Sequence, residues 1–229
     1  ITFGVISVRD TLAATNQYTP SASDEQKDRY FILPENITYS VTENTGTTGK
    51  VGIMHVQGDN NSIIDYQNTY SGFDVQAGAI LDISNIQFRN AISNSKGGII
   101  NNSGIVGATT ISGINNSSFV NNSAIMGGAI YNIGTIYSIA NTNFTENIVT
   151  SSRESTYGGA IYNTGTIGRI ENVTFTQNKA VSSQYAYGGA IYNTGNIEYI
   201  SASFIGNYTV GTNVFGGAIY SSNNLKLIA

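Results

Sequence analysis

A five-residue run, Gly-Gly-Ala-Ile-Tyr, recurs along this 229-residue chain and constrains its fold more than any other feature. Four full copies and two weaker upstream copies begin at Gly127, Gly158, Gly188 and Gly216, and at Gly97 and Ala77. Successive copies start 20, 30, 31, 30 and 28 residues apart. Self-similarity at a fixed period of this size is typical of solenoids and other stacked repeats.

Two further elements recur in register with the first. A phenylalanine is followed three residues later by asparagine at Phe119/Asn122, Phe144/Asn147, Phe175/Asn178 and Phe204/Asn207. Two isoleucines stand three residues apart at Ile111/Ile114, Ile136/Ile139, Ile167/Ile170 and Ile197/Ile200. Three linked elements repeated four times indicate one structural unit per repeat.

The residue types within each repeat favour strands over helices. Gly, Asn, Thr, Ser and Ile dominate, and these are poor or mediocre helix formers. Apolar residues alternate in short runs, as in Val173-Thr174-Phe175, instead of recurring with a helical period. Each repeat therefore predicts three short strands per coil: Ala-Ile-Tyr-Asn, Thr-Ile-x-x-Ile and x-x-Phe-x-x-Asn. Stacked coils of this kind form an all-β parallel β-helix, or β-solenoid.

Comparison of the copies assigns the faces of the first and third strands. The isoleucine slot is never polar, so it is expected inside, and the next slot, which accepts Asn101 in place of tyrosine, is expected outside. The following slot, which includes Asn132 and Asn163, should turn inward and form an amide ladder. The repeated phenylalanines should stack inside. The asparagines three residues after them are expected to cap the next turn, because Asn tolerates a left-handed backbone.

The start of the chain differs from the repeats. Residues 1–50 hold much of the charge and carry no repeat, so they are expected to form a polar cap over the first coil. Residues 51–229 are expected to form the coils of a single continuous domain, with regular repeats from about 78 to 220. The last residues show no capping features, which predicts that the chain is a fragment of a longer protein.

Composition narrows the classes of function. Only 10% of residues are charged, the net charge is −4 and there is no cysteine. This excludes disulfide frameworks and thiolate sites, and disfavours nucleic acid as a partner. No apolar run reaches the length of a membrane span. The glycine pairs lack the spacing and lysine of a phosphate-binding loop. We therefore expect no cofactor.

The paired Gly-Gly-Ala-Ile and Phe-x-x-Asn elements resemble the repeats of chlamydial polymorphic outer membrane proteins. More broadly, they resemble passenger domains of type V autotransporters, which implies a pectin-lyase-like right-handed β-helix. The N-terminal segment Phe31–Tyr39 fits the same order of elements. Two departures are Ala91, which stands where Phe88 would be followed by asparagine, and Ile99, which replaces the alanine of the motif.

The resemblance implies a secreted bacterial protein at the cell surface or outer membrane, acting as a non-enzymatic adhesin in host–pathogen contact. Its expected partners are a host cell-surface protein or glycan, with self-association as a further option. A membrane would be reached only through a C-terminal translocator barrel that this chain does not contain. A pure structural spacer is the bland alternative.

The segments between Phe-x-x-Asn and the next glycine pair form the candidate binding site. They should leave the solenoid at one corner and stack into an aromatic, uncharged ridge suited to sugar rings or a protein. Its candidate residues are Tyr157, Tyr185, Tyr187, Tyr208, Phe215 and Arg153. Alternatively, these aromatics fold back and serve packing. The outward tyrosines 131, 162, 192 and 220 are interpreted as a stabilising stack.

A polysaccharide lyase or hydrolase is the enzymatic alternative, since related β-helices include both. Such enzymes need clustered carboxylates or calcium ligands, yet all seven aspartates lie at or before Asp82. Four of them could approach one another near the cap and hold calcium, although turn capping is the favoured explanation: Asp59, Asp65, Asp74 and Asp82. We therefore assign no catalytic and no metal residue.

The single histidine, His55, has no partner at a recognisable spacing and is interpreted as a structural or surface residue. Arg169, Glu171 and Glu198 are expected to form a surface ion pair across coils. An ice-binding solenoid would need a regular outward array of threonine, and the outward slots hold other residues.

Overall fold

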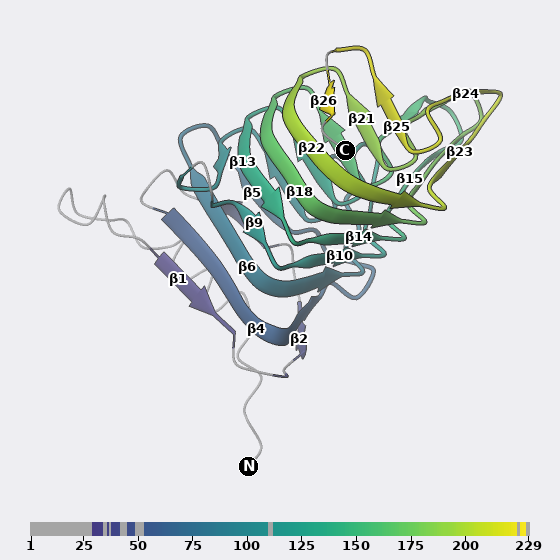
Figure 1. The fold of residues 1–229 in the computed structure, drawn as a ribbon. Coiled ribbons are helices and arrows are strands. Elements are labelled where there is room, and N and C mark those ends of the chain that lie inside the picture. The colour runs from purple at the N-terminus through teal and green to yellow at the C-terminus, as the bar shows by residue number, and fades with distance from the viewer. Residues whose placement is uncertain are drawn as a thin grey trace.

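The computed structural model describes residues 29–33, 36, 38–41, 45–48, 53–109, 112–223 and 225–227, and within these the chain forms strands and turns. Every strand pairing among them is parallel, between successive coils, which confirms the parallel β-helix (Figure 1). The strands lie side by side as stripes, from β1 and β4 at one end to β22, β25 and β26 at the other. The predicted strand Ile1–Val8 and most of the predicted cap lie outside the described residues.

The largest sheet, sheet A, has twelve strands. They are β1 (Arg29–Ile32), β2 (Thr38–Ser40), β4 (Ile53–Asp65), β6 (Ile80–Arg89), β8 (Ile105–Val106), β9 (Ile114–Asn115), β10 (Ser118–Val120), β13 (Thr135–Ala140), β14 (Asn143–Thr145), β18 (Thr166–Thr176), β22 (Asn196–Ile205) and β26 (Leu225–Leu227). The second and third predicted strands of a coil both belong to this sheet. In β18 and β22 they run together as one strand with a register shift after Glu171.

The Ile-Tyr-Asn segments form sheet B, with seven strands. They are β3 (Gly46–Thr48), β5 (Phe73–Val75), β7 (Ile100–Asn102), β12 (Ile130–Asn132), β17 (Ile161–Asn163), β21 (Ile191–Asn193) and β25 (Ile219–Ser221). The prediction that the segment from Ala77 is a weak copy of the repeat is wrong, because the residue that pairs with Ile100 in sheet B is Phe73 and not Ile80. Ile80 instead pairs with Ile105 in sheet A.

The connections after Phe-x-x-Asn are themselves strands in two further sheets. Sheet C contains β11 (Ser123–Ala124), β15 (Ile148–Ser151), β19 (Lys179–Ser182) and β23 (Tyr208–Val210). Sheet D contains β16 (Thr156–Tyr157), β20 (Tyr185–Tyr187) and β24 (Asn213–Phe215). The third side of a coil is therefore sheet C, with sheet D added at its far edge. A small apolar cluster of Val149, Ala180 and Ala186 holds these two sheets together.

The core is a set of ladders that run along the solenoid axis. Phe88, Phe119, Phe144 and Phe175 are fully buried, and neighbouring rings in this row lie 5.4, 4.8 and 4.9 Å apart. The expected phenylalanine stack is confirmed and continues to Phe204 at 5.0 Å. The buried isoleucines of sheets A and B fill the remaining interior.

A buried amide ladder follows the isoleucines of sheet B, as expected. Asn102 donates to Asn132, Asn132 to Asn163 and Asn163 to Asn193, each over 2.7 Å between Nδ2 and Oδ1. A second ladder joins the asparagines that follow phenylalanine, from Asn122 through Asn147 and Asn178 to Asn207, each over 2.9 Å. Such ladders satisfy buried polar groups without ions.

The second ladder corrects the expectation that its asparagines adopt the left-handed backbone. The positive φ belongs to the residue before each of them, such as Asn121 at 53° and Glu146 at 55°. The ladder asparagines are instead buried, and their side-chain amides donate to the asparagine of the next coil and to a phenylalanine carbonyl of the previous coil. Asn147, for example, donates to Asn178 Oδ1 and to the carbonyl of Phe119.

The two glycines of each pair are needed for different structural reasons. The first has a positive φ, 64° at Gly158 and 60° at Gly188, so it turns the chain from sheet D into sheet B. The second stands where a Cβ would clash with the backbone of the next coil, as at Gly159 against Gly189. The position of Ile111 lies outside the described residues, and its expected slot opposite Ile136 is filled by Val106.

Candidate interaction surface

Two columns of aromatic side chains run along the corner between sheets D and B. The first column contains Tyr157, Tyr187 and Phe215, the last residues of β16, β20 and β24. Their rings stack at 5.2 and 4.8 Å, with interplanar angles of 6° and 10°. The rings align because the strands pair in register across coils.

The second column consists of the tyrosines at the centre of the sheet B strands. Tyr131, Tyr162, Tyr192 and Tyr220 stack with ring separations of 4.8, 5.0 and 5.3 Å. Lys96 covers the first ring of the column, its Nζ lying 4.5 Å from the Tyr131 ring centre. The expected tyrosine stack is therefore present, with Tyr162, Tyr192 and Tyr220 half-buried and Tyr131 buried.

The two columns meet edge to face and make one surface. Tyr157 contacts Tyr192 at 4.9 Å and 67°, and Tyr187 contacts Tyr220 at 5.0 Å and 69°. Perpendicular ring contacts are a favoured aromatic geometry. We call this set the aromatic surface, with the members Tyr131, Tyr157, Tyr162, Tyr185, Tyr187, Tyr192, Phe215 and Tyr220.

The structure brings together four of the six ridge residues predicted from the sequence. Tyr157, Tyr187 and Phe215 form the first column, and Tyr185 stacks 6.3 Å from Tyr187 and 6.5 Å from Phe215. Tyr208 lies apart: it begins β23 and lines a shallow pocket with Glu146 and Lys179. Tyr208 has no ring contact with the described aromatic residues.

Arg153 lies in the exposed turn between β15 and β16, where its carbonyl accepts a hydrogen bond from Gln184 Nε2 over 2.9 Å. Arg153 forms no ion pair with a described residue. The sheet B tyrosines are the members that sequence reasoning did not join to the ridge. The signal was present in the sequence, because the residue before each glycine pair stands four positions before the isoleucine and five before the tyrosine of the same copy.

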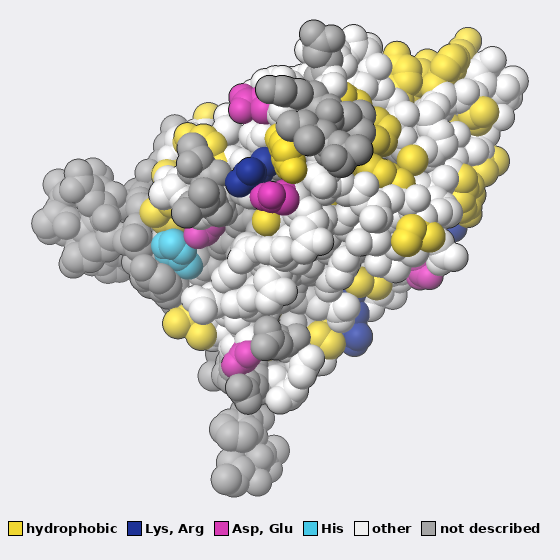
Figure 2. Space-filling view, in the orientation of Figure 1, with side chains coloured by type: hydrophobic (Ala, Val, Ile, Leu, Met, Phe, Trp, Pro, Cys, Tyr) yellow, Lys and Arg dark blue, Asp and Glu magenta, His cyan; other side chains and the backbone are white. Residues whose placement is uncertain are grey.

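The aromatic surface is partly packing and partly exposed. Tyr157, Tyr187 and Tyr192 are half-buried between the columns, whereas Tyr185 and Phe215 are each 42% exposed. Figure 2 shows hydrophobic side chains gathered over the end of the solenoid that carries β24. Both sequence interpretations of these residues, packing and display, therefore describe part of the same cluster.

Three tyrosines of the aromatic surface have raised pKa values. Burial, together with the neighbouring tyrosines, raises the pKa of Tyr162 to about 12. Burial and neighbouring tyrosines also raise the pKa values of Tyr187 and Tyr192. These three side chains therefore offer uncharged hydroxyl donors at physiological pH.

The four aspartates considered as calcium ligands do not converge on one site among the described residues, so the interpretation of a calcium site is not supported. Asp65 Oδ2 accepts from Arg89 Nε at 2.8 Å, Asp82 lies 3.4 Å from His55 and Asp74 accepts from Asn101. No group of three or more metal-ligating side chains occurs within the described ranges. These acids serve local pairing, and His55 has a structural partner.

The environments of two aspartates differ. Burial opposes ionisation of Asp65, but the N–H of Gln67, the amide of Asn90 and the guanidinium of Arg89 outweigh it and hold its pKa below the usual range. Burial raises the pKa of Asp82, although His55 partly offsets the shift.

The expected ion pair across coils is replaced by a pair within one strand. Arg169 Nη1 lies 3.4 Å from Glu171 Oε2, both on β18. Across the coil, the Arg169 guanidinium lies 5.6 Å from the ring centre of Tyr199. Glu198 accepts a hydrogen bond from Asn196 in its own strand.

Comparisons with known proteins agree with this architecture. The model of the Chlamydia polymorphic membrane protein repeat matches residues 141–164 and 172–194. Each match spans one Phe-x-x-Asn segment and the sheet B strand that follows it. Searches of curated proteins and of solved structures gave no significant match. Within the described residues, no helix is long and apolar enough to span a membrane.

Proposed function

Because this chain is a β-helix of the polymorphic outer membrane protein passenger type, we propose that it acts as a non-enzymatic adhesin at the bacterial surface. The matched family is a family of surface proteins associated with the outer membrane, and generally not of enzymes. The aromatic surface is the single observation that supports an adhesive role.

The geometry of the aromatic surface favours a host protein over a glycan as its partner. Sugar rings bind to the open faces of aromatic side chains, but stacking at 4.8–5.3 Å occupies the ring faces within each column. Ring edges and hydroxyl groups are what remains for a partner. These suit an apolar protein patch with carbonyl acceptors or aromatic faces, since tyrosine and phenylalanine are enriched at the cores of protein interfaces.

The hydrolase or lyase alternative gains no support from the described carboxylates. Such an enzyme would bring several acids into one groove. Here Asp65 pairs with Arg89, Asp82 with His55 and Glu171 with Arg169, in separate places.

Binding of the purified chain to cultured host epithelial cells tests the proposal. The double variant Tyr185→Ser with Phe215→Ser removes two exposed rings, and binding should weaken at least about 10-fold, as at interface hot spots. The control variant Ile205→Ser with Val210→Ser alters two exposed apolar residues in the coil of Phe215, outside the aromatic surface, and should bind as the wild type does.

Thermal unfolding must first show that both variants fold. Unchanged binding of the Tyr185/Phe215 variant would remove the aromatic surface from the function, and no binding by the wild type would leave a spacer role. Treating the host cells with protease or with glycosidases distinguishes the partners: the proposal requires that protease abolishes binding and that glycosidases do not.

A further inference from the structure

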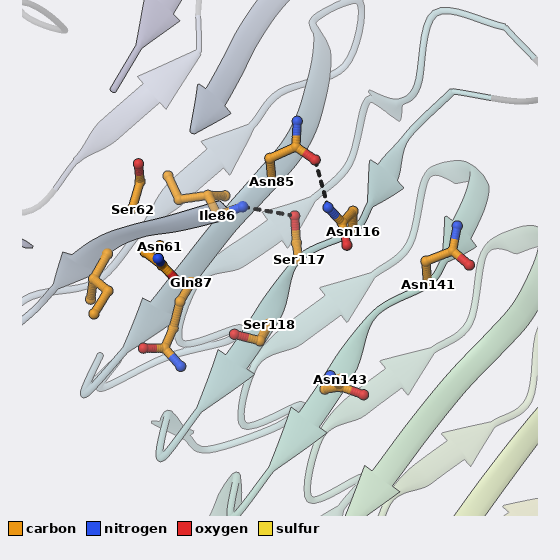
Figure 3. A pocket seen from close by; sticks show the side chains of 11 residues that line it. Asn61, Ser62, Asn85, Ile86, Gln87, Asn116, Ser117, Ser118, Asn141 and Asn143 are labelled. Atoms are coloured by element: carbon orange, nitrogen blue, oxygen red, sulfur yellow. Dashed lines mark hydrogen bonds between the residues drawn. The ribbon is translucent and has the colours of Figure 1, made fainter. Parts of the chain in front are cut away.

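A second feature of the surface, remote from the aromatic surface, is a groove along the bend of sheet A. Its volume is about 290 Å³ and its walls come from β4, β6, β10, β14 and the turns that precede β10 and β14 (Figure 3). We call it the asparagine groove, and its lining residues are Asn61, Ser62, Ile63, Asn85, Ile86, Gln87, Asn116, Ser117, Ser118, Asn141 and Asn143.

The groove exists because three successive coils each bend at one left-handed asparagine. Asn85, Asn116 and Asn141 have φ values of 58°, 47° and 49°, a conformation that Asn adopts more readily than most residues. After Asn116 and after Asn141, the hydroxyl of the next residue accepts a hydrogen bond from a backbone N–H at the bend. Ser117 Oγ accepts from the N–H of Ile86 at 3.4 Å, and Thr142 Oγ1 accepts from that of Ser117 at 3.4 Å.

The walls of the groove are two rows of side chains along the axis (Figure 3). The bend asparagines form one row. The residues two positions later form the other, in which Gln87, Ser118 and Asn143 are aligned by strand pairing. Stacked coils repeat every 4.7–4.9 Å, so the coils of Asn85, Asn116 and Asn141 each present a pair of polar side chains at this spacing, whereas the first coil places Ile63 in the second row.

The side-chain amide of Asn141, in the first row, is held in place and still has bonding capacity. Asn141 Nδ2 donates to Asn115 Oδ1 at 3.0 Å, and Asn141 Oδ1 accepts from Asn172 Nδ2 at 2.7 Å. An amide has two N–H donors and two acceptor lone pairs, so one of each remains at Asn141 for a ligand. A pre-positioned donor and acceptor lose little side-chain entropy on binding.

The lining carries no charged side chain, in contrast to a phosphate or acidic-polymer site. Its donors and acceptors are amides and hydroxyls, which pair well with the hydroxyl groups of neutral sugars. Figure 2 shows the same polarity over the wider face of sheet A, where uncharged polar side chains predominate. We propose that the asparagine groove binds a neutral oligosaccharide, extended along the solenoid axis.

Isothermal titration of the full chain with neutral oligosaccharides (cellohexaose, maltohexaose and chitohexaose) tests the proposal, with polygalacturonate as the acidic comparison. At least one neutral chain should bind, and polygalacturonate should not. The variant Asn141→Gly with Asn143→Ala deletes one amide from each row, and Gly retains the left-handed backbone. Loss of two hydrogen bonds predicts a roughly 5- to 30-fold weaker affinity.

The chain provides a matched control outside the groove. Asn121 has the same left-handed conformation, and Thr174 pairs with Asn143 one coil further along, but neither lines the groove. The side-chain amide of Asn121 donates to Asn90, which also lies outside the lining. Asn121→Gly with Thr174→Ala should therefore change the affinity less than 2-fold. The proposal is overturned if no neutral oligosaccharide binds, if the groove variant binds as well as the wild type, or if both variants weaken equally. These outcomes are independent of cell binding by the aromatic surface.

Discussion

At the scale of single residues, left-handed positions explain part of the asparagine content. Asparagine tolerates a positive φ, and eight described asparagines adopt it, mostly at two places in a coil: at the bend of sheet A, as in Asn116, and after phenylalanine, as in Asn121. Glu146, Gln177 and Gly206 occupy the second of these positions in later coils. The Phe-x-x-Asn motif led to the prediction of a left-handed backbone at Asn122, one residue after the true left-handed position at Asn121. The asparagine at 122 recurs because of its buried hydrogen bonds.

The Asp65–Arg89 pair gives a prediction about acid stability. The pKa of Asp65 lies below its usual range in the folded state, so its contribution is present above the unfolded pKa of about 3.9 and is lost as the pH falls toward the folded pKa. Asp65→Asn should lower the free energy of unfolding by about 1–2 kcal/mol at pH 7 and converge with the wild type in acid.

Urea unfolding monitored by circular dichroism at several pH values measures this difference. Glu154→Gln, which alters an exposed carboxylate, serves as the control and should remain within about 0.5 kcal/mol of the wild type. A difference between Asp65→Asn and the wild type that persists unchanged in acid would contradict the assigned hydrogen bonds.

At the scale of elements, the ladders decide how short strands become a stable stack. Strands of three residues, such as β12 and β17, offer few backbone hydrogen bonds each. The in-register isoleucine, tyrosine and asparagine of these strands add a buried apolar contact, a ring stack and an amide bond at every coil. The ladder asparagines are therefore expected to tolerate substitution far less than the exposed ones.

Asn163→Asp tests the buried amide ladder with almost no change in shape. The new carboxylate cannot donate to Asn193 Oδ1 or to the carbonyl of Asn196, and a buried, uncompensated charge costs about 3 kcal/mol or more. Burial would raise the folded-state pKa of the new carboxyl above its unfolded value. The destabilisation should therefore grow as the pH rises through the folded-state pKa and shrink in acid.

Thermal unfolding from pH 4 to pH 8 provides the measurement. The matched control is Asn172→Asp, at an exposed left-handed position, which should shift the midpoint little at any pH. Equal midpoints for the two variants at pH 8 would show that the amide ladder does not hold the coils together.

At the scale of the whole molecule, stability depends on neighbouring coils. A solenoid behaves as a one-dimensional array in which each repeat contacts its neighbours, and opening is easiest where one neighbour is missing. The residues after Ala202 whose burial the structure describes are all half-buried or exposed, including Val214 at 49% and Ile205 at 56%. The central coils are covered on both sides.

Native-state hydrogen exchange followed by mass spectrometry should therefore show a gradient. Backbone amides of β12, β17 and β21 should exchange slowest, and those of β23, β24 and β25 at least about 100-fold faster, because local opening spans a wide range of free energies. Equal protection across these strands would indicate a single cooperative unit instead.

The repeats alone determined the parallel β-helix, the buried isoleucine and phenylalanine rows and the first amide ladder, because a side chain that stacks on its own copy leaves a periodic trace. The way in which the segments of one coil lie relative to one another leaves no periodic pattern in the sequence. The pairing of Ile80 with Ile105, the strands of sheets C and D and the joined aromatic columns follow from which backbones lie within hydrogen-bonding distance. The groove is a further case, since asparagines such as Asn85 and Asn116 meet only when the coils stack. The sequence by itself determines which residues stack on their own copies. The contacts between different faces of a coil depend on the shape of its cross-section, which only the tertiary structure decided.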